Sequence, residues 1–311
     1  MPTPVESDLF DMPCPFKQVT LIGAGLIGGS FAWLVRERFD AQTLAIHLID
    51  PNENTLQSAL KKGIASTAKP QLPESFTGDH LVILATHLDG NEALLQEVAT
   101  RVRDENVLVT DIGSCKRDIT ALGSSLLPQQ FVGGHPMAGR EKAGFEHASP
   151  LLFYKKRFLL TPHPEFKRDD LLRRFQHFLE QIGMIPVLLD ALEHDTAMAY
   201  VSHLPQLYAV VLTNLIAQHR PGHLLAFHGG GIDDQLRLAA SPATMWGPIY
   251  QRNADNMQLV LDEMITLLQN MRENIGNPEA VQEWFSVSNQ IHTAYQQLKS
   301  EQTHPAHNRL L

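Results

Sequence analysis

The stretch over residues 18–30, QVTLIGAGLIGGS, constrains this chain more than any other. A short run of β-branched and apolar residues leads into a glycine-rich turn, and the turn leads into an apolar helix start. A dinucleotide pyrophosphate needs this order, because the turn offers backbone N–H groups and the helix N-terminus carries partial positive charge. The turn residues that we expect to bind the dinucleotide are Gly23, Ala24, Gly25, Leu26, Ile27 and Gly28.

A carboxylate further along the chain completes this pattern. Residues 44–49 predict a second strand, which ends at Asp50, about 20 residues after Gly28, where an acidic side chain bonds a ribose 2′-hydroxyl. Asp50 would repel the 2′-phosphate of NADP, and residues 51–60 contain no Arg to offset it. The sequence therefore predicts NAD as the cofactor.

The composition limits which binding partners and which cellular compartment are expected for this protein. The 311 residues carry a net charge of −9, which disfavours nucleic acid or an anionic membrane as partner. Two cysteines form neither a disulfide framework nor a metal site, so we expect a cytoplasmic protein. No apolar run approaches the ~20 residues of a membrane span. His219 and His223 are separated by Pro and Gly, so helical ligand spacing is lost and we expect no metal.

Strand and helix patterns alternate from the first strand to residue 189. This alternation predicts an α/β fold with a doubly wound parallel sheet and helices on both faces. From residue 190 to about residue 300 only helical patterns follow, which predicts a second, all-α domain. The expected divisions are a mobile leader over residues 1–15, a dinucleotide-binding domain over 16–189, a helical substrate and dimerisation domain over 190–300, and a polar tail over 301–311.

The helical half begins with a capping pattern, Asp190 followed by Glu193, and Pro205 predicts a kink further on. Two segments near its end have apolar residues at helical spacing. Such faces pack on each other or form a subunit interface, and the sequence leaves both possibilities open. Their members are Val260, Met264, Leu267, Leu268, Met271 and Ile275 in the first, and Val281, Trp284, Phe285, Ser288, Ile291, Tyr295 and Leu298 in the second.

Three predicted strands deliver polar residues to the sheet edge where a dinucleotide binds. Thr86 follows one strand, Ser114 follows the next, and His135 ends a third between a glycine pair and a proline. A neutral imidazole there suits proton abstraction from an alcohol as hydride leaves the same carbon. Ser114 is placed to bond His135 or the nicotinamide amide. The alternative is that both residues only satisfy backbone groups in loops.

The helical half offers a second polar cluster. His194 lies at a helix start, and His203 and Gln206 are three residues apart, so they share a helix face. Arg237 follows a glycine-rich loop and is suited to clamp a carboxylate by two parallel hydrogen bonds. The alternative for Arg237 is a surface ion pair with Asp233 or Asp234.

With these motifs in hand, the chain resembles the prephenate/arogenate dehydrogenase family. The resemblance extends over residues 23–246, and its motifs are GAGLIGGS, TDIGSCK, GGHPMAGREKAG, the HD and SHLP elements, and GGGIDDQLRLAASPATMW. It implies NAD-dependent oxidative decarboxylation of a cyclohexadiene acid and a homodimer formed by interlocking helical domains.

The resemblance also implies roles for individual residues. His135 matches the catalytic histidine at the ring C4 hydroxyl, and Ser114 matches the serine that orients it. Arg237 matches the arginine that grips the ring carboxylate. The remaining matches are His194 and His203 near the substrate, Glu141 and Asp234 flanking Arg237, and Trp246 at the dimer interface. Gln206 stands where the family often has His, which leaves the choice between prephenate and arogenate open.

The sequence is therefore compatible with three functions. The leading one is a prephenate dehydrogenase of tyrosine biosynthesis. The nearest alternative is a dehydrogenase of arogenate or of an amino-deoxy analogue of prephenate. A different class is a non-catalytic dinucleotide sensor whose helices serve dimerisation, and such a sensor would need none of His135, Ser114 and Arg237.

Overall fold

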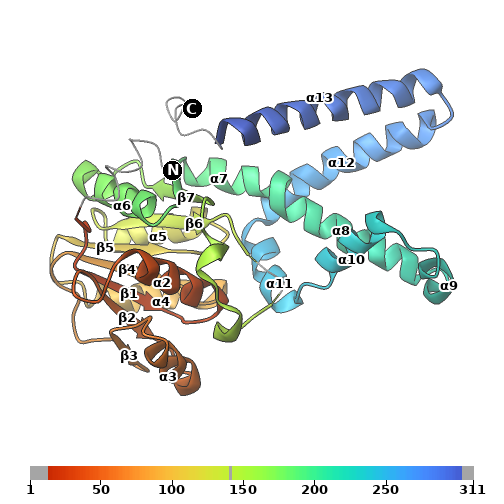
Figure 1. The fold of residues 1–311 in the computed structure, drawn as a ribbon. Helices are drawn as coiled ribbons and strands as arrows, with labels where there is room; N and C mark the ends of the chain where they lie inside the picture. Colours follow the sequence, from red (N-terminus) through yellow and green to blue (C-terminus); the bar gives the residue numbers. More distant parts are fainter. Residues whose placement is uncertain (1–12, 140–141, 303–311) are drawn as a thin grey trace. The chain divides into compact units, whose positions relative to one another are not determined.

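The computed structural model describes residues 13–139 and 142–302 (Figure 1). It contains two compact units, one ending at Met257 and the other beginning at Gln258. This division by packing does not test the functional domains predicted at 16–189 and 190–300, which stay predictions. Residues 1–12 of the expected leader and 303–311 of the expected tail lie outside the described residues. Cys14 is buried in the core, so a mobile leader does not extend to it.

The first unit is built on one eight-stranded sheet of order β3-β2-β1-β4-β5-β6-β7-β8. Its strands are β1 (Gln18–Ile22), β2 (Ala45–Ile49), β3 (Thr67–Lys69), β4 (His80–Leu84), β5 (Val107–Asp111), β6 (Phe131–Pro136), β7 (Arg157–Pro162) and β8 (Ile185–Leu188). The order of β3 to β6 is that of a doubly wound dinucleotide fold, whose chain reverses direction across the sheet between β1 and β4. The predicted fold class is confirmed.

The last two strands differ from the all-parallel expectation. β7 runs antiparallel to β6, and β8 runs parallel to β7. Parallel neighbours need a crossover, usually a helix. The described part of the β6–β7 connection instead holds two short 3₁₀ helices, η1 (Phe145–His147) and η2 (Pro150–Leu152), so the chain re-enters the sheet in the opposite direction. The apolar pattern of a buried strand carries no information on its direction.

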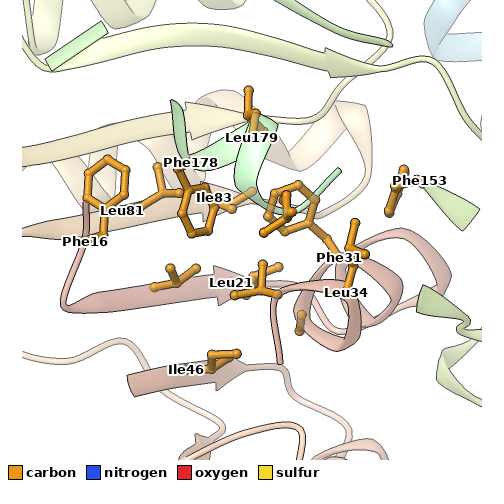
Figure 2. Close-up of a cluster of buried hydrophobic side chains, with 14 of the residues drawn as sticks. Phe16, Leu21, Phe31, Leu34, Ile46, Leu81, Ile83, Phe153, Phe178 and Leu179 are labelled. Atoms are coloured by element: carbon orange, nitrogen blue, oxygen red, sulfur yellow. The ribbon is translucent and has the colours of Figure 1, made fainter. Parts of the chain in front are cut away.

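Helices cover both faces of the sheet. The helices of this part are α2 (Leu26–Arg38), α3 (Glu53–Lys61), α4 (Leu88–Ala99), α5 (Arg117–Leu126) and α6 (Asp169–Gln181). The larger apolar cluster joins α2 and α6 to one face, with Phe31 and Phe178 buried in it (Figure 2). The smaller cluster joins α4 and α5 to the other face through Leu95 and Ile119. Burial on both faces explains why these strands read as nearly continuous apolar runs.

Only helices follow β8 within the described residues. They are α7 (Ala191–Met198), the π-helix η3 (Ala199–His203), α8 (Leu204–Ala217), α9 (Pro221–Leu225), α10 (Gly230–Ala239), α11 (Ala243–Arg252), α12 (Ala254–Asn274) and α13 (Pro278–Gln302). Asp190 caps α7, as predicted, with its carboxylate accepting from the N–H groups of Leu192 and Glu193. The widened turn η3 lies next to Pro205, which has no N–H to donate to the Val201 carbonyl.

The second unit contains most of α12 and all of α13. Much of the apolar surface predicted there is exposed, including Leu267 at 60%, Phe285 at 66% and Ile291 at 67%. No helix among residues 13–139 and 142–302 is both long enough and apolar enough to cross a membrane.

Candidate active site

The glycine turn has the geometry of a phosphate-binding loop. Gly23 has φ of +100°, and a Cβ there would lie 2.4 Å from the Ala85 carbonyl oxygen, so the turn and the end of β4 approach closely. A Cβ on Gly28 would lie 2.0 Å from the Gly23 carbonyl oxygen, so the start of α2 packs directly on the turn. Gly25, the N-cap residue of α2, faces open space, and α2 has neither a side-chain cap nor an acidic residue in its first turn. The helix N-terminus is therefore suited to an anionic group.

Asp50 lies beside this turn at the end of β2. Its Oδ2 accepts from the Ala24 N–H at 2.7 Å, and its Oδ1 accepts from the Asn52 N–H at 2.8 Å. A carboxylate oxygen has two acceptor sites, so both oxygens keep capacity for a ribose hydroxyl. These residues fit a dinucleotide that carries free ribose hydroxyls, as NAD does.

The carboxyl ends of β1, β4, β5 and β6 meet at one edge of the sheet, because these strands are parallel. The glycine turn follows β1, and Thr86 follows β4. Ser114 lies in the segment after β5, and His135 lies near the end of β6. The structure therefore brings together the polar residues that the sequence expected at this edge. Thr86 is exposed, and its hydroxyl donates to the Asn91 side chain at 2.7 Å.

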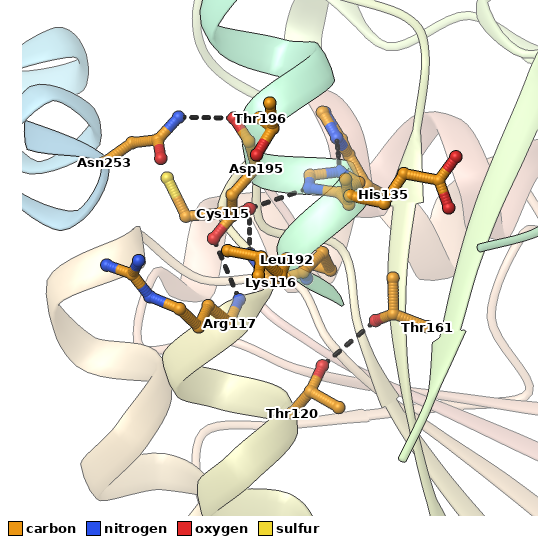
Figure 3. Close-up of polar contacts among 12 residues, drawn as sticks. Cys115, Lys116, Arg117, Thr120, His135, Thr161, Leu192, Asp195, Thr196 and Asn253 are labelled. Atoms are coloured by element: carbon orange, nitrogen blue, oxygen red, sulfur yellow. Dashed lines mark hydrogen bonds and ion pairs between the residues drawn. The ribbon is translucent and has the colours of Figure 1, made fainter. Parts of the chain in front are cut away.

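His135 is the first member of a chain of three hydrogen-bonded side chains (Figure 3). Its Nδ1 lies 2.8 Å from Nε2 of His194, and Nδ1 of His194 lies 2.8 Å from Oδ1 of Asp195. Asp195 in turn accepts from the backbone N–H groups of Lys116 at 2.8 Å and Arg117 at 3.0 Å. Asp195 and His194 are buried, whereas His135 is half-buried. The middle of α7 is thereby fixed to the start of α5.

A buried ion pair holds the backbone next to His135. Lys116 Nζ contacts Asp111 Oδ2 and donates to the Gly134 carbonyl at 2.7 Å. Asp111 also accepts from the Gly134 N–H at 3.2 Å. Both side chains are at most 1% exposed, so the pair ties the end of β5 to the residue before His135.

The electrostatic environment keeps these histidines neutral. Burial lowers the pKa of His135 well below its ordinary value, and the nearby His194, Lys116 and His203 lower it further. Burial also lowers the pKa of His194, although its bond to Asp195 opposes this. Burial lowers the pKa of His203 to about 4. Near neutral pH, His135 is therefore an unprotonated base.

His203 lies at the end of η3 and is linked to the same network. The Asn253 amide donates to the Asp195 carbonyl at 2.7 Å and faces His203 Nδ1 at 3.1 Å. Because this amide nitrogen is a donor, His203 Nδ1 accepts, and neutral His203 carries its proton on Nε2. The Trp246 ring packs edge-on against His203 with centroids 6.1 Å apart.

Gln206, which the sequence predicts near the substrate, connects two helices in the structure. It is buried, and its amide donates to the Leu238 carbonyl at 2.7 Å. That carbonyl belongs to α10, so Gln206 joins α8 to the helix that carries Arg237. His194 is also buried, and both of its ring nitrogens are hydrogen-bonded within the protein. The substrate contacts expected for Gln206 and His194 stay predictions.

Other expected site residues are less closely tied to His135. Arg237 and Asp234 are exposed on α10 and form an ion pair at 3.8 Å. Ser114 is half-buried, and its hydroxyl makes no hydrogen bond among the described residues, including none to His135. Glu141 lies outside the described residues. In the described part of the chain, no cluster of His, Cys, Asp or Glu is arranged to hold a metal ion.

Four members of the network were not predicted as site residues from the sequence. They are Asp111, Lys116, Asp195 and Asn253. Asp111 and Lys116 belong to the motif TDIGSCK, and Asp195 follows His194 directly. A charged residue among apolar neighbours in the sequence could have indicated the buried charges. A charged residue in a solvated loop shows the same sequence pattern, so the signal does not distinguish the two settings.

A doubly wound sheet with an open glycine turn and a neutral histidine at the same edge defines a dinucleotide-dependent oxidoreductase. Two family models match the chain, "Prephenate dehydrogenase, nucleotide-binding domain" over residues 34–187 and "Prephenate dehydrogenase, dimerization domain" over residues 190–287. The chain belongs to the prephenate dehydrogenase family. The first match begins after the glycine turn, so the turn supports the assignment independently.

Individual relatives agree with this family. A prephenate dehydrogenase of Bacillus subtilis (strain 168) is 29% identical over 266 residues, which cover 84% of this chain and 71% of the relative. A cyclohexadienyl dehydrogenase of Zymomonas mobilis is 25% identical and covers 85% of this chain and 90% of its own length. The crystal structure of prephenate dehydrogenase from Aquifex aeolicus with hydroxyphenyl propionate and NAD⁺ is 27% identical, with a TM-score of 0.80 over 91% of this chain and 98% of that one.

Proposed function

We propose that this protein is an NAD-dependent prephenate dehydrogenase that forms 4-hydroxyphenylpyruvate. The observation that carries the proposal is the position of His135. It ends β6 at the sheet edge that also carries the glycine turn, and its Nε2 makes no hydrogen bond among the described residues. An unprotonated ring nitrogen at this edge suits the removal of a hydroxyl proton.

The proposed reaction needs one base. NAD, held by the glycine turn and Asp50, supplies the hydride acceptor for C4 of the substrate ring. His135 takes the proton of the C4 hydroxyl, so a ketone forms at C4. The bond from C1 to its carboxylate then breaks, carbon dioxide leaves, and the electron pair completes the aromatic ring and reaches the C4 oxygen. Protonated His135 returns its proton to that oxygen, and the phenol results.

Two further residues would hold the substrate. Arg237 is suited to bind the ring carboxylate, because a guanidinium matches a carboxylate by two parallel hydrogen bonds. In this structure Arg237 forms a solvent-exposed ion pair with Asp234 at 3.8 Å. The remaining sequence-based roles, including those of Ser114, Trp246 and Glu141, are kept as proposals.

The side-chain preference rests on His203. Its Nδ1 faces the Asn253 amide, so its Nε2–H is a donor. A donor suits the keto-acid oxygens of prephenate better than the ammonium group of arogenate. Relatives carry the names prephenate dehydrogenase and cyclohexadienyl dehydrogenase, so both acids belong in the test.

The test is an assay of the full-length protein with NAD and each acid in turn. Absorbance of the reduced nicotinamide should rise with prephenate, and kcat/KM should be higher for prephenate than for arogenate. A higher kcat/KM for arogenate would reverse the proposed preference. NAD binding without turnover of either acid would instead favour the dinucleotide sensor.

We further propose a homodimer formed through the helical region. The matched dimerization-domain model covers residues 190–287. Exposed apolar side chains on α13 occur at the spacing of one face, among them Phe285, Ile291 and Tyr295. A contiguous apolar face of this kind marks a contact surface in most soluble proteins. A second copy of this chain is the occupant that the family model favours.

Charges placed on this face should separate the subunits. We expect Phe285→Glu together with Ile291→Glu to change a dimer into a monomer in size-exclusion chromatography with light scattering, because the charges would be buried without partners. Gln297→Glu is the matched control, since Gln297 is exposed on α13 and does not belong to the apolar spacing. A monomeric wild-type protein at micromolar concentration would contradict the proposal.

The location of the protein stays a prediction. Cys14 and Cys115 are both free and buried, which agrees with a reducing compartment such as the cytoplasm. The net charge of −9 gives no reason to expect nucleic acid or a membrane as partner.

A further inference from the structure

Asp195 is the fixed end of the hydrogen-bond chain that leads to His135. Its carboxylate accepts from two backbone N–H groups, those of Lys116 at 2.8 Å and Arg117 at 3.0 Å, and these groups can only donate. Burial alone raises the pKa of Asp195, but the bonds from His194, Arg117 and Lys116 leave this pKa below its ordinary value. Asp195 is therefore ionised at neutral pH and has no proton to give.

An ionised Asp195 determines where each histidine carries its proton. His194 Nδ1 lies 2.8 Å from the Asp195 carboxylate and must be the donor in that contact. Neutral His194 then has only a lone pair on Nε2. His135 Nδ1, 2.8 Å from that atom, must donate to it. The only unprotonated ring nitrogen of His135 is consequently Nε2.

We infer that Asp195 and His194 are positioning residues that hold His135 in the Nδ1–H tautomer and thereby make Nε2 the basic atom. The inference rests on the proposed function, in which His135 is the base. Neither Asp195 nor His194 touches the substrate in this arrangement, because both His194 ring nitrogens and both Asp195 carboxylate oxygens are already hydrogen-bonded within the protein. Their role differs from the substrate contact that the sequence suggested for His194.

The arrangement also suits the catalytic cycle. When Nε2 of His135 takes a proton, Nδ1 keeps its hydrogen and remains a donor to His194. No member of the chain needs to rotate or change partner, so the polar environment is already organised for the protonated ring. In the opposite tautomer, Nε2 would carry a hydrogen and could not accept one.

Two variants of His194 separate positioning from packing. His194→Met has a comparable volume but removes the acceptor for His135 Nδ1, so the ring is free to carry its proton on Nε2. His194→Gln keeps an amide oxygen that can accept from Nδ1. We expect His194→Met to lower kcat by about 100-fold or more, since a wrong histidine tautomer disables a base of this kind. His194→Gln should recover most of the loss, and NAD affinity should be unchanged in both.

The tautomers are read directly by ¹⁵N NMR of histidine-labelled protein without substrate, with His135 assigned by its disappearance in His135→Asn. In the wild type, the protons of both His135 and His194 should lie on Nδ1. In His194→Met, the His135 proton should move to Nε2. A wild-type proton on Nε2 of His135, or a kcat for His194→Met within about threefold of wild type, would overturn the inference.

This design keeps two failures apart. The spectra need no substrate, so they test the tautomer even if the substrate differs from the proposed one. Turnover of prephenate combined with the wrong tautomer would leave the proposed function standing and remove the roles of Asp195 and His194. If His194→Met failed to fold, the wild-type spectra would still test the inference. They show which nitrogen of His135 carries the proton, and whether His194 carries its own proton on the Nδ1 atom that faces Asp195.

Discussion

Replacement of His135 by Asn should lower kcat for prephenate by about 1,000-fold and leave the affinity for NAD unchanged. Asn has a similar polar shape but cannot take the hydroxyl proton, and removal of a general base costs between about 100-fold and 10,000-fold. The measurement is steady-state turnover of His135→Asn beside NAD binding by calorimetry. His219→Asn, on an exposed histidine, is the matched control.

Loss of NAD binding together with turnover would mean that His135 supports the fold rather than the reaction. The pH profile of the wild type gives a second readout. The pKa of His135 lies below its ordinary value of 6.5, mainly because of burial, so the base stays unprotonated as the pH falls through 6.5. We expect kcat/KM to stay level there and to decline only at lower pH. A decline centred above pH 6.5 would contradict this assignment.

Replacement of Lys116 by Met should lower the free energy of unfolding by about 3–5 kcal/mol, the usual cost of breaking a buried ion pair from one side. The variant leaves the Asp111 charge buried without its partner and removes the donor to the Gly134 carbonyl. Urea denaturation at a fixed protein concentration measures the effect.

The neighbouring residue offers a matched control. Arg117 pairs with Asp255 in a setting where both side chains are solvent-exposed, at 37% and 57%. Arg117→Met should therefore cost less than about 1 kcal/mol. Combining Lys116→Met with Asp111→Asn should recover part of the loss, because no charge is then left buried. Equal destabilisation by Lys116→Met and Arg117→Met would show that the buried pair is not the source of the effect.

The region of the fold that binds the dinucleotide could be predicted from sequence because its signals are local. Gly23 is required by the positive φ of the turn itself, and Gly28 by its close approach to the Gly23 carbonyl. Asp190 likewise caps a helix through an N–H group only two residues away. Strand and helix patterns over residues 18–188 likewise reflect which side chains each element buries. Such patterns gave the fold class, although the short strand β3 was missed because it has only three residues, two of them exposed.

The direction of β7 and β8 could not be predicted from sequence. An apolar strand has the same composition whichever way it runs, and the direction depends on how the connection from β6 packs. The same limit applies to the apolar faces of α12 and α13. Their spacing predicted helices, but only the exposure of residues such as Phe285 favours a subunit contact over packing within the chain.

The sequence by itself determined the dinucleotide turn, the cofactor preference argued from Asp50 and the placement of His135 at a strand end, because each depends on neighbours along the chain. Only the tertiary structure decided what surrounds His135. His194 lies 59 positions away from it in the sequence, and Lys116 reaches Asp195 across 79. Contacts of this range follow from how α5, α7 and β6 pack, and packing free energy is shared among many residues rather than encoded at any one of them.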